Sequence, residues 1–197
     1  MTRKILLVGA GNSRDKKLKF PGDAPEWDGK LVTVDMNPDC GADVVHDMAV
    51  RPLPFKDAEF DEVHAYDSLE HWGAQGDWRA WFDEMAEYHR ILKPGGRFAA
   101  IVPQGADYFA DPGHTRFFSL NHFLFLSQQF YDEQQQLGTS ATDYRWYWKL
   151  NFDVLAANVM GNPAHHLAVV LQKDGYAPLR EPGLLERLTR KLLTVRA

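Results

Sequence analysis

The chain has 197 residues, of which 45% are hydrophobic and 25% charged, a composition typical of one globular domain with a sizeable core. Its formal net charge is -5 and it contains no long basic run, which disfavours a protein dedicated to binding duplex nucleic acid. The single cysteine, Cys40, cannot form an internal disulfide, so we expect a reducing, cytoplasmic environment. No segment approaches 18 consecutive apolar residues, and we therefore expect no contact with a membrane.

Short apolar runs predict the strands of a buried, mostly parallel sheet. Four of them end at a glycine, a proline or a polar residue: 5–8, 31–34, 42–45 and 98–102. A fifth run, 60–66, is weaker because Asp61 and Glu62 interrupt it. Open α/β sheets bind ligands at the carboxyl ends of their strands, so the residues that follow these runs are the first candidates for a site.

The first crossover, residues 14–30, is irregular because Pro21 and Pro25 leave room only for a short helix or a loop. With few apolar anchors, we expect this segment to open easily and to order over a bound cofactor. Between the fourth and fifth strands, apolar residues recur at helical spacing from Trp78 to Leu92 and predict an amphipathic helix packed on the sheet.

The second half of the chain predicts further helices and a hairpin. Ser119 favours the N-cap of a helix that continues to about Phe130, followed by a polar connection at 134–138. The segments 144–158 and 166–172 predict two antiparallel strands at a sheet edge. Leucines at helical spacing predict a C-terminal helix at about 182–196.

The first strand runs into Gly9-Ala10-Gly11-Asn12-Ser13, a turn in which backbone N–H groups are able to approach a ligand closely. A glycine turn chosen only for its tight geometry is the alternative. Arg14 stands where the dinucleotide fingerprint G-x-G-x-x-G has glycine or alanine, which counts against a nicotinamide cofactor. No P-loop motif occurs in the sequence.

Two carboxylates follow the next strands. Asp35 ends the second strand, where a carboxylate accepts hydrogen bonds from the hydroxyls of a ribose, although it also suits a turn cap before Asn37. Asp47 follows the third strand and is a candidate acceptor for the exocyclic amine of adenine. Met36 and Met48 offer polarizable surface to the adenine ring, although methionines here are more often core residues.

These features occur together with two more specific segments, Leu-Glu-His at 69–71 and Leu-Lys-Pro-Gly-Gly at 92–96. In this order they resemble class I S-adenosylmethionine-dependent methyltransferases over roughly residues 4–103. The resemblance implies a single α/β, Rossmann-like domain over 1–197, with a mostly parallel seven-stranded sheet and a C-terminal antiparallel hairpin. It also implies a cofactor half at about 1–103 and an acceptor-side half at about 104–180.

The resemblance implies S-adenosylmethionine as the cofactor. The residues expected to bind it are Gly9, Gly11, Asn12, Asp35, Met36, Asp47, Met48 and Asp67. Family members usually carry an acidic residue two positions before the first glycine, where this chain has Leu7, and their third glycine is replaced by Ser13. How the methionine end of the cofactor is held is therefore open, with Arg14, Lys16 and Lys17 as candidates.

Methyl transfer requires alignment of nucleophile, methyl carbon and sulfur, and a general base only for a weak or protonated acceptor. His71 and His114 follow the fourth and fifth strands and are the candidate catalytic residues, because an imidazole accepts protons near neutral pH. Loop positioning is the alternative role for each. No H-E-x-x-H motif or matching carboxylate cluster occurs in the sequence, so we expect no metal site.

The motifs of DNA amino-methylating and cytosine-methylating enzymes are missing, since Ser68 and Leu69 follow Asp67 and the lone cysteine follows Asp39. Many aromatic residues lie in the later segments and leave room for a planar or apolar acceptor. We expect an acceptor that is a small molecule or a modified polymer end. A catalytically silent cofactor-binding or scaffold protein, or a nucleotide-sugar or nicotinamide enzyme, remains an alternative, and the sequence does not indicate the oligomeric state.

Overall fold

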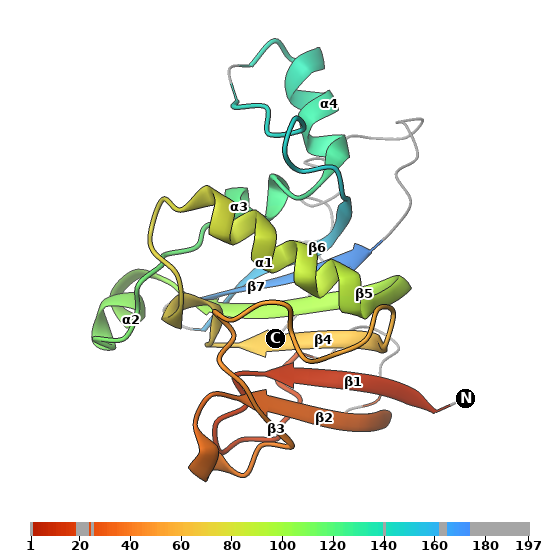
Figure 1. Ribbon diagram of the computed structural model, residues 1–197. Helices are drawn as coiled ribbons and strands as arrows, with labels where there is room; N and C mark the ends of the chain where they lie inside the picture. Colours follow the sequence, from red (N-terminus) through yellow and green to blue (C-terminus); the bar gives the residue numbers. More distant parts are fainter. Residues whose placement is uncertain (1, 19–23, 25, 140, 162–164, 174–197) are drawn as a thin grey trace.

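The computed structural model describes residues 2–18, 24, 26–139, 141–161 and 165–173. Its centre is a seven-stranded sheet in the order β3-β2-β1-β4-β5-β7-β6 (Figure 1). The strands are β1 (Arg3–Val8), β2 (Gly29–Asp35), β3 (Val44–Val45), β4 (Phe60–Tyr66), β5 (Leu92–Pro103), β6 (Phe152–Met160) and β7 (His166–Lys173). The first five are parallel, and β7 runs antiparallel to both β5 and β6. The predicted α/β fold class is confirmed.

Helix α1 (Trp78–Ile91) covers one face of the sheet (Figure 1). The Asp77 side chain caps its first turn by accepting the Ala80 N–H at 3.1 Å. Its apolar side packs Phe82 and Met85 into the main core against strand residues such as Val63. The amphipathic helix predicted from the spacing of apolar residues is therefore present, and β5 begins directly after it, earlier than the predicted strand 98–102.

The other face of the sheet carries a smaller core that includes Leu7, Tyr66 and Ile101. In the described part of the first crossover this face is covered by a loop, which contributes Leu18 and Trp27, and no helix is present there. This outcome agrees with the short helix or loop predicted for 14–30. The loop and the glycine turn before it therefore pack on the sheet beside the carboxyl end of β1.

The single helix predicted from Ser119 to about Phe130 is wrong. The chain instead forms α3 (Leu120–Leu124) and α4 (Gln128–Gln136), with the break at 125–127. The reason lies in tertiary hydrogen bonds: the Leu126 carbonyl accepts the Phe152 N–H at 3.0 Å and the Trp148 indole N–H at 2.9 Å. Residues 134–136, predicted as part of a polar connection, belong to α4.

The strand predicted at 144–158 begins only at Phe152. Residues 144–148 form a turn in which the Tyr144 carbonyl accepts the Tyr147 and Trp148 N–H groups, each at 2.8 Å. Their aromatic rings pack individually on α1, since Trp148 stacks on Phe82 with ring centroids 5.4 Å apart. Aromatic residues favour strands, but here packing on a helix decided the conformation.

Two short 3₁₀ helices, η1 (Pro38–Cys40) and η2 (Leu69–His71), and the six-residue helix α2 (Gly105–Ala110) follow the carboxyl ends of the strands. None of the helices in the described part of the chain combines the length and the apolarity needed to cross a bilayer. The predicted C-terminal helix at about 182–196 lies outside the described residues.

Candidate functional site

The carboxyl end of β1 lies directly against the segment that follows β4. Gly9 has a φ of 60°, and a Cβ at this position would lie only 2.4 Å from the Ser68 Cβ. Only glycine meets both conditions. The turn that follows is tied to β2, because Asp35 accepts the Gly11 N–H at 2.8 Å.

Asp35 also accepts the Asn37 N–H at 2.8 Å, so the turn cap considered from the sequence is formed. This role does not exclude ribose binding, because each carboxylate oxygen has two lone pairs and Asp35 is only partly buried. The structure thus brings Gly9, Gly11 and Asp35 together at one edge of the sheet, as a nucleoside site requires. Asn12 follows in the same turn and is exposed.

Asp47 is exposed beyond β3 and accepts the Ala49 N–H at 2.8 Å. The two methionines differ sharply in burial, since Met36 is 66% exposed while Met48 is 4% exposed within the main core. Met48 is therefore a core residue, and of the two methionines only Met36 is exposed enough for the predicted contact with adenine.

The three basic residues that are candidates for holding the methionine end of the cofactor all interact with other groups of the protein. Arg14 donates to the carbonyls of Gly11 and Gly41, and so clamps the glycine turn against the loop after η1. Lys16 is buried and donates to the Ala24 carbonyl at 3.3 Å. Lys17 is exposed and pairs at 2.9 Å with Asp67, which directly follows β4.

Asp67 directly follows β4 and has a φ of 49°, an uncommon value for a residue other than glycine. Its second oxygen lies 3.3 Å from the His166 Nε2 on β7. Leu7, at the position where the resemblance led us to expect an acid, is 3% exposed and belongs to the smaller core. Asp67 is therefore a carboxylate available at the edge where Leu7 provides none.

Glu70 is the functional candidate that the sequence analysis missed. Its side chain is 0% exposed, and neither carboxylate oxygen has a hydrogen-bond partner among the described residues. Burial, reinforced by the charges of Asp67 and Asp111, raises the pKa of Glu70 to about 8. The only advance signal was its place in the Leu-Glu-His motif.

His71 and His114, predicted as catalytic, lie side by side with ring centroids 4.7 Å apart. The His114 Nδ1 donates to the Tyr108 carbonyl at 2.7 Å, so its Nε2 carries the free lone pair. That Nε2 lies 3.7 Å from a carboxylate oxygen of Glu70. The sequence predicted no metal site, but the structure brings one carboxylate and two imidazoles together, with one ligand atom from each of these three residues within 4.8 Å of the other two.

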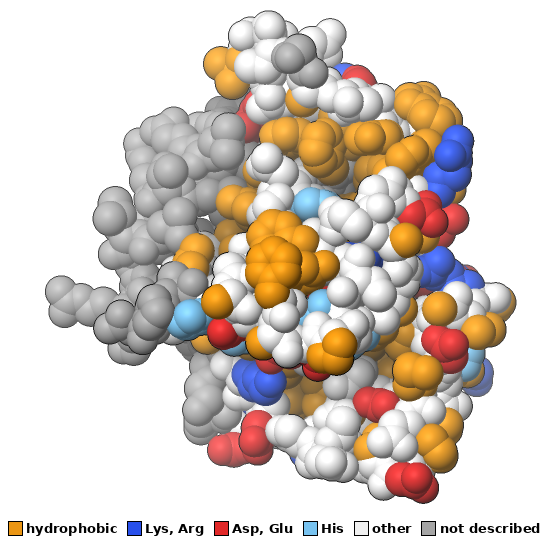
Figure 2. Space-filling model, turned by 90° about the vertical axis from the view of Figure 1, so that its left-hand side faces the viewer, with side chains coloured by type: hydrophobic (Ala, Val, Ile, Leu, Met, Phe, Trp, Pro, Cys, Tyr) orange, Lys and Arg blue, Asp and Glu red, His pale blue; other side chains and the backbone are white. Residues whose placement is uncertain are grey.

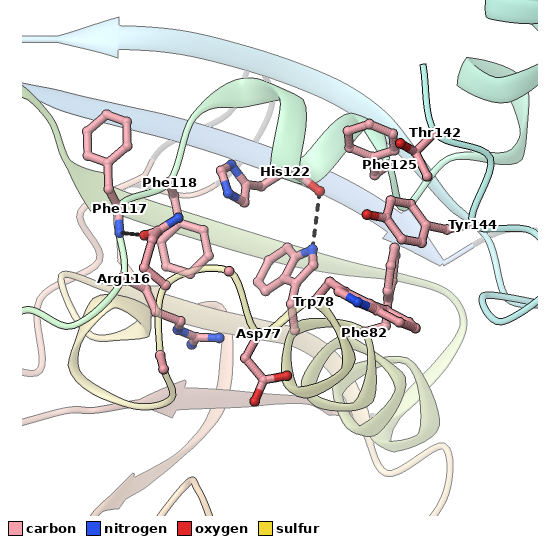
Figure 3. Close-up of a pocket in the computed structure, with 14 residues that line it drawn as sticks. Asp77, Trp78, Phe82, Arg116, Phe117, Phe118, His122, Phe125, Thr142 and Tyr144 are labelled. Atoms are coloured by element: carbon pink, nitrogen blue, oxygen red, sulfur yellow. Dashed lines mark hydrogen bonds between the residues drawn. The ribbon is translucent and has the colours of Figure 1, made fainter. Parts of the chain in front are cut away.

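Figure 2 shows the edge of the sheet that carries these residues, with histidine side chains reaching the surface near its middle and hydrophobic side chains beside them. A pocket of about 390 Å³ opens beside this edge, between the start of α1 and the segment before α3. Its walls are mostly aromatic and include Trp78, Phe117, Phe118 and Tyr144 (Figure 3). This setting matches the planar or apolar acceptor expected from the sequence.

Arg116 connects the pocket with the histidine pair. Its guanidinium lines the pocket and donates to Glu84 at 2.7 Å, and both side chains are buried. Its backbone N–H donates to the Glu70 carbonyl, and the guanidinium also donates to the Leu69 carbonyl at 2.7 Å. Arg116 thus holds the segment after β4 against the pocket wall.

Residues 28–100 match the family described as "Methyltransferase domain". No curated protein matches the chain by sequence. Solved structures of methyltransferases share its fold. The chain covers 94% of an S-adenosylmethionine-dependent methyltransferase from Methanosarcina mazei over 89% of its own length, with 14% identity and a TM-score of 0.52.

A second structure is an S-adenosylmethionine-dependent methyltransferase from Archaeoglobus fulgidus. It has 13% identity and a TM-score of 0.53, with 87% of this chain and 86% of that chain covered. The third is 1,6-didemethyltoxoflavin-N1-methyltransferase from Burkholderia thailandensis, solved with bound 1,6-didemethyltoxoflavin and S-adenosylhomocysteine. It has 18% identity and a TM-score of 0.51, with 88% of this chain and 72% of that chain covered.

The sheet order, the antiparallel β7 and these similar structures define the fold of class I methyltransferases. Together with the family match over 28–100, they confirm the resemblance to S-adenosylmethionine-dependent methyltransferases that the motifs indicated.

Proposed function

We propose that this protein transfers a methyl group from S-adenosylmethionine to a small molecule or a modified polymer end. One observation carries the proposal: Asp35 accepts the N–H of Gly11 at 2.8 Å, so the glycine turn and the ribose-binding candidate form one unit at the ligand-binding edge of the sheet. A cytoplasmic location is part of the same proposal and rests on the lone cysteine.

In this proposal the adenosine lies across the ends of β1 and β2. Gly9, Gly11 and Asn12 present backbone to it, Asp35 accepts from the ribose hydroxyls, and Asp47 accepts from the adenine amine while Met36 contacts the ring. Asp67 and Lys17 lie toward the methionine end. The bound cofactor supplies an electrophilic methyl group for in-line transfer.

The acceptor lies on the side of β4 and β5. The aromatic pocket holds the planar or apolar part of the acceptor, and His71 and His114 lie beside the acceptor atom that receives the methyl group. In the metal-free protein the Nε2 of His114 is the atom that takes a proton from the acceptor, because the Tyr108 carbonyl fixes the other ring nitrogen as a donor.

A catalytically silent cofactor-binding protein is the second candidate. The buried Leu7 favours it, because the acid that usually holds the cofactor's amino group is missing there. Transfer of a labelled methyl group from S-adenosylmethionine to components of a cell extract separates the two. Binding of the cofactor without transfer would support the silent protein.

The cofactor assignment is tested by calorimetry with S-adenosylhomocysteine and, separately, with a reduced nicotinamide. We expect only the first to bind. Asp35→Ala should weaken it at least tenfold, because charge-assisted hydrogen bonds to the ribose contribute about 1.5 to 3 kcal/mol each. Asp39→Ala, an exposed aspartate in η1, is the matched control. Equal affinity in folded Asp35→Ala and Asp39→Ala would contradict the ribose contact.

A further inference from the structure

The segment after β4 buries a carboxylate to which the described part of the chain donates no hydrogen bond. Glu70 is 0% exposed, and neither of its oxygens accepts a hydrogen bond there. Buried carboxylates are ordinarily paired, hydrogen-bonded or bound to a metal. A buried carboxyl group that accepts no hydrogen bond therefore indicates a missing cation or ligand.

Two imidazoles face this carboxylate, and the surrounding groups orient one of them. The Nδ1 of His114 donates to the Tyr108 carbonyl at 2.7 Å, which leaves the Nε2 lone pair 3.7 Å from Glu70 Oε1. An imidazole fixed by a backbone carbonyl on one nitrogen is the usual arrangement of a histidine that binds a metal through the other. His71 packs edge-on against His114 and is exposed, so it has room to turn.

The separations suit an ion after a small adjustment. One ligand atom each from Glu70, His71 and His114 lies within 4.8 Å of the other two. Ligands at about 2.0–2.2 Å from a zinc-sized ion lie roughly 3.3–3.6 Å apart. Rotation of the exposed His71 and a shift of about an ångström close the difference. Among the described residues this is the one group of histidine, cysteine and acidic side chains with such spacing.

We propose that Glu70, His71 and His114 bind one divalent first-row transition-metal ion. Two nitrogen ligands and one carboxylate suit Zn²⁺, Co²⁺ or Fe²⁺, whereas Mg²⁺ prefers an all-oxygen set. Three protein ligands are the number typical of a catalytic zinc site, which keeps a position open for water or substrate.

The open position lies on the exposed side of His71, and an oxygen donor of the methyl acceptor takes it. This part rests on the proposed function. A metal bound here would lower the pKa of a hydroxyl that it coordinates, so that the acceptor passes its proton to solvent. Its oxygen would then form a bond to the methyl carbon while the bond from that carbon to the cofactor's sulfur breaks and S-adenosylhomocysteine leaves. The Nε2 of His114 then acts as a ligand and no longer as the proton acceptor. The site accordingly favours acceptors that present a hydroxyl or enol oxygen.

The test uses the full chain, freed of metal with a chelator and then titrated with Zn²⁺, Co²⁺ and Mg²⁺ by calorimetry. We expect one Zn²⁺ or Co²⁺ per chain, visible absorption from bound Co²⁺, and much weaker binding of Mg²⁺. Glu70→Gln, His71→Ala and His114→Ala should each weaken Zn²⁺ binding at least 100-fold, since changes to groups that only orient a ligand already cost about 10–100-fold.

His165→Ala is the matched control, because this histidine also faces a carboxylate, Asp107 at 3.2 Å, but lies outside the cluster. It should bind Zn²⁺ as the native protein does. The exposed His71→Ala keeps the test valid even if the buried Glu70→Gln fails to fold. No Zn²⁺ binding by the native protein, or equal binding by native protein and His71→Ala, would overturn the proposal.

The open position is tested with acetohydroxamate, a small oxygen chelator, added to the Co²⁺-loaded protein. We expect a change in the Co²⁺ absorption with the metal retained, and an unchanged spectrum would refute the open position. A separate titration with S-adenosylhomocysteine keeps the two proposals apart. Binding of Zn²⁺ without binding of S-adenosylhomocysteine would support the metal site and contradict the proposed function. Binding of S-adenosylhomocysteine without binding of Zn²⁺ would support the proposed function and contradict the metal site.

Discussion

Two buried glutamates on and after β4 have opposite environments. Glu62, near the amino end of the strand, is 1% exposed and pairs with Arg3 of β1 and Arg97 of β5. Glu70, beyond the carboxyl end, is 0% exposed and has no hydrogen-bond partner among the described residues. The partnered carboxylate ties three strands together, whereas the unpartnered one marks the edge where a ligand supplies what the fold does not.

The different environments shift the pKa values of Glu62 and Glu70 in opposite directions. Burial acts to raise the pKa of Glu62, but a hydrogen bond with His64 and the charges of Arg97 and Arg3 lower it to about 2. Burial, reinforced by the charges of Asp67 and Asp111, raises the pKa of Glu70 to about 8, because its own backbone N–H and the charge of Arg116 oppose this rise only in part. At neutral pH the first is ionised, while the second is largely protonated without a cation.

Removing the partnered carboxylate should have the largest effect. Glu62→Gln removes the buried anion that faces the partly buried Arg3 and Arg97, and we expect a loss of about 3–5 kcal/mol in the free energy of unfolding in urea. Glu59→Gln, whose carboxylate pairs with Lys4 nearer the surface, should lose about 1 kcal/mol or less. Equal losses would mean that burial of the pair does not matter.

At acid pH, protonation of Glu62 should lower the free energy of unfolding by a somewhat smaller amount. The pKa of Glu62 in the folded protein, about 2, lies below its ordinary value of 4.5. Its stabilisation is therefore fully present above pH 4.5 and is lost as the pH falls toward 2. By linkage this amounts to about 3 kcal/mol. Urea unfolding of native protein and Glu62→Gln should converge over this range, and parallel curves would contradict the assignment.

Glu70 should behave with the opposite sign. The folded pKa of about 8 lies above the ordinary 4.5, so its contribution is fully present below pH 4.5 and is lost as the pH rises through 8. In metal-free protein, Glu70→Gln should gain about 2 kcal/mol relative to the native chain between about pH 6 and pH 8. Thermal or urea unfolding in a chelator measures this gain. Added Zn²⁺ should reverse it by stabilising only the native chain, because a ligand stabilises the state that binds it.

The smallest effect is expected at the exposed ion pair of the same edge. Lys17 and Asp67 have side chains that are 42% and 34% exposed, so Lys17→Ala should change the free energy of unfolding by about 0.5 kcal/mol or less. The same variant is then suitable for measuring affinity for S-adenosylhomocysteine without a stability change. A loss above about 1 kcal/mol would show that this edge is tied together as firmly as the amino end.

Several features of the protein follow from local sequence. The apolar runs of β1, β2, β4 and β5 and the helical spacing of α1 determined which elements form, since periodic burial is a local pattern. Gly9, Gly11 and Asp35 were identified because strand ends carry the ligands of an open α/β sheet. Residues 60–66 still formed a strand, although Glu62 weakened the pattern, because its charge is neutralised from the neighbouring strands.

Only the tertiary structure decided the rest. The helix expected from Ser119 onward is broken because Leu126 gives its carbonyl to Phe152 and Trp148, more than twenty residues away. Likewise, the sequence identified His71 and His114 separately, but the contact between their rings depends on how the segments after β4 and β5 pack together. Glu70 could be recognised as a functional candidate only in the folded chain. The burial of its carboxylate and the lack of a hydrogen-bond partner result from tertiary packing and not from any short segment of sequence.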